Sequence, residues 1–263
     1  MTAVLGALGA LGAASPVGSV AGRTRPVTLA GEQLLPVLAP LAELLPGGGL
    51  RRGSVVVVPA GSVSGVSGAT SLALALMAAV SQAGSWCAAV GLPGLGLVAA
   101  AELGIALERF ALVPDPAEQW PVVTAALIDA VDVVLVRPSR RVWPADARRL
   151  RARARERGTV LVPCGGSWPE GADLRMVVAR SGWQGLGQGD GSLRARLVEV
   201  VASGRGAAAR EHRIQLWLPG LDGAVAACEG SDRLAAEGLA ADELAAEGLA
   251  VDELAADERL AVG

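Results

Sequence analysis

The stretch GSVSGVSGATSLALAL, at Gly61–Leu76, has the spacing of a loop that binds phosphate and then runs into a helix. Such loops use glycines so that backbone N–H groups can surround a phosphate, a lysine that reaches its outer oxygens, and a hydroxyl that binds magnesium. The lysine position is Ala69 and the first glycine position is Val63, so the cation that holds a triphosphate is missing. The candidate phosphate-binding residues that remain are Gly65, Gly68, Thr70 and Ser71.

Few other side chains have the spacing of a reactive site. Cys87, Cys164 and Cys228 show no CxxC pairing and His212 is the one histidine, so we expect no bound metal and a reduced environment. The sequence contains neither a GxSxG nucleophile motif nor an HExxH zinc motif, and His212 has no evident triad partners. We therefore predict no catalytic residue and no cofactor.

The elements that must position these side chains follow the pattern of an α/β protein. Apolar β-branched runs alternate with alanine-rich helical runs, which is typical of a mostly parallel central sheet flanked by helices. Later apolar runs lack intervening helices, which predicts antiparallel strands at one edge. The expected parallel strands are Ser54–Ala60, Trp86–Gly91, Arg109–Pro114, Asp132–Pro138 and Thr159–Cys164, with helices at Thr70–Gln82, Pro121–Ala130 and Ala145–Arg157. The expected edge strands are Asp173–Arg180, Ala195–Gly204 and His212–Pro219, with a turn at Ser181–Gly191.

Residues 30–219 also resemble the ATPase core of RecA. LLPGGGLRRGSVVVVPAG resembles the glycine-rich approach to that family's first core strand, and TSLALAL resembles the helix after its phosphate loop. WCAAVGLPGLGLVAAAELGIALERFALVPDPAEQ is similar to the RecA segment that carries the catalytic glutamate and then a PD…EQ motif. DVVLVRPS resembles the next strand, which in RecA ends in the aspartate that organises magnesium. The resemblance implies a RecA-like fold, without RecA's polymerising amino-terminal elements or its carboxy-terminal domain.

Three positions depart from that family where its chemistry is done. Ala69 stands for the lysine, Pro93 for the glutamate and Arg137 for the aspartate. Because catalysis of phosphoryl transfer consists mostly of positioning and charge stabilisation by such groups, we expect a pseudo-ATPase that hydrolyses no ATP.

A shortened RecA-like core without ATPase residues resembles the ImuA proteins, particularly their actinobacterial relatives. These accompany ImuB, a catalytically inactive relative of Y-family polymerases, and an error-prone polymerase in damage-induced mutagenesis. The resemblance implies a non-catalytic adaptor in translesion synthesis that recruits or stabilises these two partners. An alternative is a RecA-like DNA-binding protein or recombination regulator that retains nucleotide binding through Gly68, Thr70, Ser71 and backbone amides.

Arginine clusters are the candidate surfaces for DNA or an acidic partner. Residues 137–157 carry nine arginines against Asp146 and Glu156, although a solvated helix face would have the same composition. Trp168 and Trp183, in expected loops, are the aromatic side chains placed to stack on bases. One helical stripe contains Arg148, Arg151 and Arg155, an adjoining stripe contains Arg149, Arg153 and Arg157, and a second patch would contain Arg194, Arg196, Arg205, Arg210 and Arg213.

Charge is divided unevenly along the chain. Residues 229–263 carry 10 acidic residues and 2 arginines, which leaves 16 acidic and 21 basic residues in 1–228. We expect a loose leader at 1–29, a core domain at 30–223 and an acidic repeat tail at 224–263 that is disordered or marginally helical. A docking peptide and a tail that folds back on the basic body are alternatives. Because no apolar window is long enough to span a bilayer, we expect a soluble cytoplasmic protein with no membrane partner.

Overall fold

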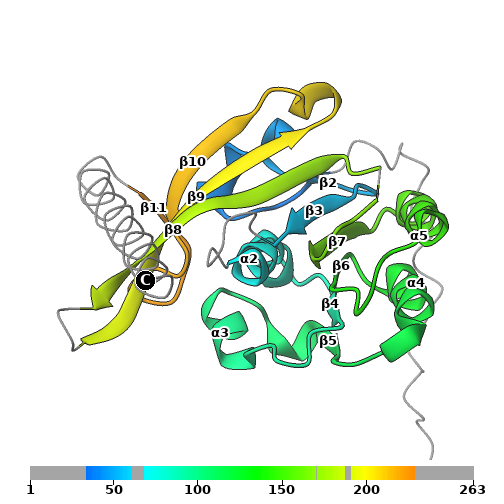
Figure 1. The fold of residues 1–263 in the computed structure, drawn as a ribbon, viewed down its shortest axis with the longest axis horizontal. Coiled ribbons are helices and arrows are strands. Elements are labelled where there is room, and N and C mark those ends of the chain that lie inside the picture. The colour runs from blue at the N-terminus through cyan, green and yellow to red at the C-terminus, as the bar shows by residue number, and fades with distance from the viewer. Residues whose placement is uncertain (1–33, 61–67, 170, 187–190, 229–263) are drawn as a thin grey trace, which may run out of the picture.

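The computed structural model describes residues 34–60, 68–169, 171–186 and 191–228. Over these ranges the chain is an α/β protein in which one large mixed sheet is flanked by helices (Figure 1). The α/β class predicted from the alternation of apolar and alanine-rich runs is therefore confirmed. The predicted leader and the tail from residue 229 onward lie outside the described residues.

Within these ranges the large sheet has the strand order β11-β10-β9-β8-β3-β7-β6-β4-β5. Neighbours from β5 to β8 run parallel, and neighbours from β8 to β11 run antiparallel, so the late apolar runs are antiparallel edge strands as predicted. The parallel strands are β3 Val56–Pro59, β4 Cys87–Val90, β5 Phe110–Val113, β6 Val133–Val136 and β7 Val160–Gly165. The remaining strands are β8 Leu174–Leu186, β9 Gly191–Gly204, β10 His212–Trp217 and β11 Ala226–Ala227.

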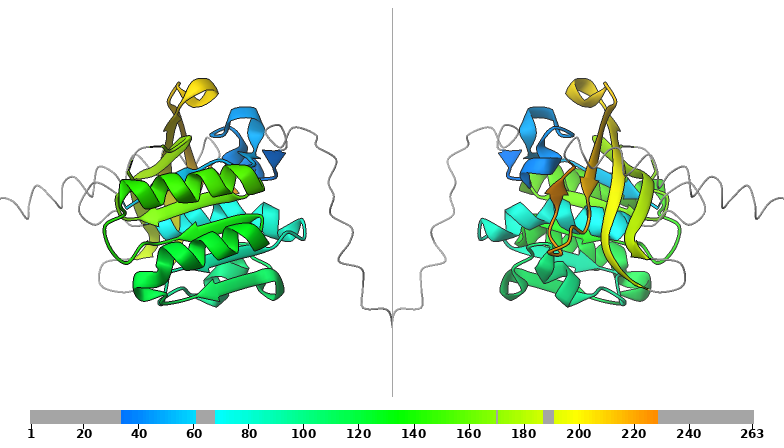
Figure 2. Two further views of the ribbon diagram at one scale, coloured as in Figure 1. Left: turned by 90° about the vertical axis from the view of Figure 1, so that its right-hand side faces the viewer. Right: turned by 90° about the vertical axis from the view of Figure 1, so that its left-hand side faces the viewer.

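Helices cover both faces of the parallel part of the sheet. In Figures 1 and 2, α2 and α3 lie on one face and α4 and α5 on the other. Successive side chains of a strand point to opposite faces, so Val56 and Val58 of β3 join the core with α2, whereas Val57 joins the core with α4 and α5. The four helices are α2 Ala69–Gln82, α3 Leu97–Glu102, α4 Trp120–Ala130 and α5 Pro144–Arg157.

The hairpin of β8 and β9 differs from the sequence-based prediction. Ser181–Gly191 was expected to be a turn, but β8 continues to Leu186, and Ser181 pairs with Val198 and Trp183 with Arg196. Trp183 therefore lies in a strand and not in a loop. Backbone pairing with β9 overrides the glycine-rich composition, and irregular register between Val178 and Arg180 accommodates the bend that such a composition permits.

Short elements complete the described chain. β1 Leu34–Leu35 and β2 Leu50–Arg51 form a separate antiparallel pair, joined through α1 Ala39–Ala42 and η1 Pro46–Gly48. The sheet continues to Ala227 in β11, beyond the core boundary expected at 223. The other 3-10 turns are η2 Leu107–Arg109, η3 Ala117–Gln119 and η4 Gly206–Ala208. None of the described helices has both the length and the apolar character needed to cross a membrane.

Candidate functional site

The candidate phosphate loop leads into α2 at the carboxyl edge of the parallel strands. Gly68 is the N-cap of α2 with φ of 135°, a conformation that favours glycine, and its carbonyl accepts a hydrogen bond from Leu72 at 2.8 Å. Thr70 and Ser71 lie half-buried in the first turn, whereas Gly65 lies outside the described residues. The first turn has no side-chain cap and no acidic residue. Its partial positive charge is therefore not compensated from within the helix.

Arg137 directs its guanidinium at this turn from the end of β6. Its Nη2 donates to Thr70 Oγ1 at 2.5 Å, and its buried Nε has no hydrogen-bond partner in the part of the chain that the structure describes. Gly165, at the end of β7, leaves the space that the side chain occupies, since a Cβ there would lie 3.1 Å from Arg137 Nε. A cation thus stands at the position where the RecA resemblance expected a magnesium-organising carboxylate.

Arg196 of β9 approaches the same turn from the opposite side. Its side chain is buried, with only 4% of the residue exposed, and a Cβ at Gly68 would lie 3.0 Å from its Nη1. Nη2 donates to Ser181 Oγ at 2.9 Å, and the guanidinium carbon lies 5.5 Å from the ring centre of Trp183. Nε has no hydrogen-bond partner within the described ranges. Burial lowers the pKa of Arg196, but an arginine remains charged at any physiological pH.

Two guanidinium groups and a helix N-terminus therefore place positive charge around Gly68 and Thr70. Among the described residues, neither Arg137 nor Arg196 forms an ion pair with a carboxylate. Buried charges normally have such partners because burial without one costs several kcal/mol. The arrangement attracts an anion and repels a divalent cation.

Cys164 adds a thiol to this cluster without adding charge. It ends β7, is buried, and interacts with both Arg137 and Thr70. Burial raises the pKa of the Cys164 thiol, while Arg137 and Thr70 act in the opposite direction and only partly offset it. The thiol therefore stays protonated at neutral pH and does not serve as the counterion of Arg137. The described residues contain no group of His, Cys, Asp and Glu side chains able to hold a metal ion.

The arginines predicted on α5 do not form one free basic surface. Arg153 and Arg157 both donate to Asp129 of α4, the latter at 3.0 Å. The hydrogen bond from Arg153, with the charges of both arginines, lowers the pKa of Asp129. Arg151 pairs with Asp173 at 3.3 Å. In the described part of the chain, the α5 arginines without an ion pair are Arg148, Arg149 and Arg155, and all three are exposed.

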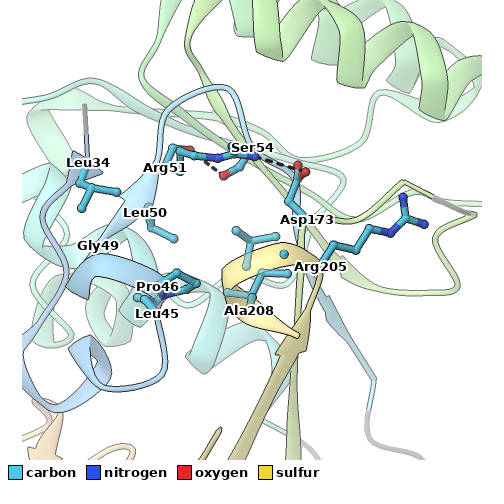
Figure 3. Close-up of a pocket in the computed structure, with 13 residues that line it drawn as sticks. Leu34, Leu45, Pro46, Gly49, Leu50, Arg51, Ser54, Asp173, Arg205 and Ala208 are labelled. Carbon is cyan, nitrogen blue, oxygen red and sulfur yellow. Dashed lines mark hydrogen bonds and ion pairs between the residues drawn. The ribbon is translucent and has the colours of Figure 1, made fainter. Parts of the chain in front are cut away.

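Asp173 joins two arginine clusters that are separate in sequence. Its carboxylate accepts from Arg51 (Figure 3) and from Arg151. Its backbone carbonyl accepts from the amide of Arg205 at 3.2 Å. Arg205 and Arg151 therefore lie near one another, at the opposite edge of the sheet from Thr70. Arg210 follows two residues after η4 and is exposed, whereas Arg213 pairs with Glu199 and Glu211.

Sequence reasoning did not predict that Arg137 and Arg196 both reach the first turn of α2. In the sequence-based prediction, Arg196 was grouped with four other arginines near the last hairpin. Its true neighbours, such as Trp183, follow from the β8–β9 register, which the sequence does not give. Another exposed feature was also missed: Trp143, before α5, is 62% exposed and carries the guanidinium of Arg141 at 6.0 Å from its ring centre. The RVWP motif gave a signal for it, since Trp143 directly precedes the proline that begins α5 and follows Val142, which is the apolar residue that reaches the core.

Two comparisons place these features among known proteins. Residues 43–170 match the family model of the MT3502 N-terminal domain, a range that includes Thr70, Arg137 and Cys164 but not Arg196. Over 159 residues the chain is 41% identical to the uncharacterized protein Rv3395c of Mycobacterium tuberculosis. That alignment covers 58% of this chain and 78% of the mycobacterial protein.

Proposed function

The chain belongs to the family of the MT3502 N-terminal domain and Rv3395c, and from that premise we propose that it is a non-catalytic adaptor in damage-induced translesion synthesis. In this proposal a RecA-like core, without the ability to hydrolyse ATP, recruits or stabilises an ImuB-type protein and an error-prone polymerase. The adaptor acts in the cytoplasm, where the damaged DNA lies.

The hydrogen bond between Arg137 and Thr70 is the observation that carries this proposal. In a working phosphate loop this hydroxyl binds magnesium, but here it accepts from a guanidinium at 2.5 Å. A magnesium ion beside that cation would meet strong repulsion in a half-buried site. Ala69 offers no charge for a triphosphate, and Pro93, in the turn after β4, cannot orient a water molecule. The first turn of α2 therefore suits a structural role in the adaptor better than phosphoryl transfer.

Exposed apolar side chains at the carboxyl edge supply a docking surface for the ImuB-type protein. Leu97 and Val98 begin α3, Val122 lies in the first turn of α4 and Trp143 precedes α5; these residues are 43%, 74%, 68% and 62% exposed. The ion pair of Arg140 with Glu118, at 2.8 Å, ties the loops before α4 and α5 together. Tryptophan and arginine are the residues that most often dominate protein interfaces, so Trp143 with its stacked Arg141 is the proposed anchor.

A co-purification experiment with the ImuB-type protein tests the adaptor proposal. We expect Trp143→Ala and Val98→Asp to reduce complex formation at least tenfold and to lower damage-induced mutation frequency in cells that depend on the plasmid-borne gene. Trp86→Ala is the matched control, because Trp86 is 50% exposed at the opposite edge, directly before β4. Unchanged binding of all three variants would remove the proposed surface, and phosphate release from ATP by the pure protein would contradict a non-catalytic role.

A second candidate function is metal-independent binding of a phosphate-bearing ligand at the first turn of α2. The Nε atoms of Arg137 and Arg196 favour it, since each is a buried donor that has no acceptor among the described residues. This reading corresponds to a regulator that retains nucleotide binding without turnover. It differs from a functional ATPase because ATP would bind equally well with and without magnesium.

A further inference from the structure

A pocket of about 370 Å³ lies at the amino-terminal edge of the parallel strands. It opens between the β1–η1–β2 segment and the turn that joins β9 to η4, and its lining is drawn in Figure 3. The pocket is therefore at the opposite edge of the sheet from Thr70 and from the proposed docking surface at Trp143. Its floor is apolar and is formed by the buried side chains of Leu45, Leu50, Val56, Leu174 and Ala208.

The rim of this pocket is positively charged. Arg51 and Asp173 line the pocket and contact each other at 3.4 Å, and Arg151, which is outside the lining, contacts the same carboxylate at 3.3 Å, so two cations share one carboxylate. Arg205 also lines the pocket, is exposed, and has no ion pair within the described ranges. An apolar floor beneath a cationic rim fits an aliphatic side chain that is flanked by carboxylates.

The described chain ends close to this pocket. Ala227 of β11 pairs with Leu216 of β10, which in turn pairs with Val198 of β9. Six residues further along β9, Gly204 pairs with Leu174 at the pocket floor. At roughly 3.3 Å per residue along a strand and about 4.8 Å between strands, Ala227 lies on the order of 20 Å from Gly204. A segment of about ten extended residues after Cys228 spans that distance.

The sequence that follows Cys228 has the complementary chemistry. Residues 229–263 contain 10 acidic residues against 2 arginines, and six leucines recur among them. The triplet Asp-Glu-Leu occurs twice, at Asp242–Leu244 and Asp252–Leu254. Each triplet presents two carboxylates directly before one leucine, which matches two rim arginines around one apolar pocket.

We propose that the acidic tail folds back and docks in this pocket. The side chain of Leu244 or Leu254 enters the apolar floor, and the preceding carboxylates contact Arg205 and Arg51. A single leucine contact is weak, but a short tether gives an effective concentration of about 1 mM, so an intrinsic Kd of about 0.1–1 mM leaves the tail docked half to nine-tenths of the time. The docked tail covers the rim arginines and competes with any other acidic ligand of this edge.

Hydrogen exchange of the full-length chain tests the docking. We expect amides at 45–51 and 204–208 to exchange about two- to tenfold more slowly in the wild type than in a variant whose six tail leucines are serines, which keeps every tail charge. Arg205→Glu and Ala208→Trp should give the same loss of protection, and 0.5 M salt should weaken it in the wild type. Arg149→Glu is the control, because it reverses an exposed charge on the α5 stripe that does not contain Arg151.

Three other results of the hydrogen-exchange experiment would overturn the docking proposal. Equal exchange in the wild type and the leucine variant means that the tail leaves the pocket open. Protection that instead needs Leu5, Leu8 and Leu11 assigns the pocket to residues 1–33, and protection that grows with protein concentration assigns it to a second copy. Ala208→Trp changes a buried position, so the surface variant Arg205→Glu keeps the test valid if the former does not fold. The experiment contains no polymerase or ImuB-type protein, so its outcome is independent of the adaptor proposal.

Discussion

Arg137 and Thr70 form a hydrogen bond of 2.5 Å between the end of β6 and the first turn of α2, beside a buried Arg137 Nε for which the described residues supply no acceptor. The bond fixes a side chain in the first turn of α2 to the end of β6. It satisfies one donor of a half-buried guanidinium and therefore contributes to stability.

Thr70→Val is expected to lower the free energy of unfolding by about 1–3 kcal/mol, because it leaves a second guanidinium N–H without an acceptor. Thermal or urea unfolding measures the change, which corresponds to a decrease in Tm of roughly 2–10 °C for a domain of this size. Thr70→Ser keeps the hydroxyl and should cost less. Ser71→Ala is a further control, because Ser71 has no hydrogen-bond partner among the described residues. A Thr70→Val protein as stable as the wild type would show that the bond contributes nothing.

An anion such as sulfate or phosphate should stabilise the protein through Arg137 and Arg196. With a Kd near 1 mM, 20 mM sulfate adds about 2 kcal/mol to the free energy of unfolding relative to chloride at equal ionic strength. Arg196→Met should abolish the increase in Tm while leaving stability in chloride no lower, since it removes a buried charge that lacks a carboxylate partner. An equal increase in Tm for wild type and Arg196→Met would place any bound anion elsewhere and remove the second candidate function.

The thiols give a pH-dependent prediction. Burial, with a smaller contribution from Asp132, raises the pKa of Cys87 from 9.0 to about 12. The folded state therefore holds this proton more tightly than the unfolded state does, so the stabilisation is complete below pH 9 and is lost as the pH rises towards 12. We expect unfolding midpoints in urea to fall between pH 8 and pH 10.5, and to fall less in Cys87→Ala.

Alkylation gives a second readout of the same burial. At pH 8, iodoacetamide should react with the half-buried Cys228 and spare Cys87 and Cys164, which are buried with raised pKa values. Rapid modification of Cys87 in the folded protein would contradict the structure of β4.

The elements that sequence reasoning predicted correctly are those in which buried apolar residues follow a regular local pattern. β3, β4 and β6 are apolar at consecutive positions because both faces of a central parallel strand are covered, and each was expected within two residues of its bounds. α2 was expected from Thr70 and begins at Ala69. The structure shows an α/β fold, whereas the RecA-like fold stays a prediction, because neither comparison names RecA.

The features that were missed depend on contacts between distant residues. The side-chain carboxylate of Asp173 meets Arg51 and Arg151, which lie 122 and 22 residues away, and no local pattern encodes that meeting. β1, β2 and β11 are only two residues long and were not predicted, because so short a strand has no periodicity of its own. Arg153 and Arg157 of α5 were predicted to be available to a partner, but both form ion pairs with Asp129. These ion pairs also depend on a distant contact, the packing of α4 against α5.

Asp129 provides a test of DNA binding by α5. Its carboxylate holds Arg153 and Arg157, so in the wild type a DNA phosphate on this face meets mainly Arg148, Arg149 and Arg155. Asp129→Asn weakens both ion pairs and removes one negative charge from the face. We expect it to tighten binding to single- or double-stranded DNA severalfold at low salt and to steepen the salt dependence, because each added phosphate contact increases the slope by about 0.7–0.9.

Glu102→Gln is the matched control for this measurement, since it removes one negative charge on α3, on the other face of the sheet. A general effect of net charge would raise the affinity of both variants equally, whereas a DNA surface on α5 raises that of Asp129→Asn alone. Fluorescence anisotropy at 50 and 200 mM salt separates the two results. If neither variant nor the wild type binds DNA at 50 mM salt, the α5 arginines serve the fold, through Asp129 and Asp173, and not nucleic acid.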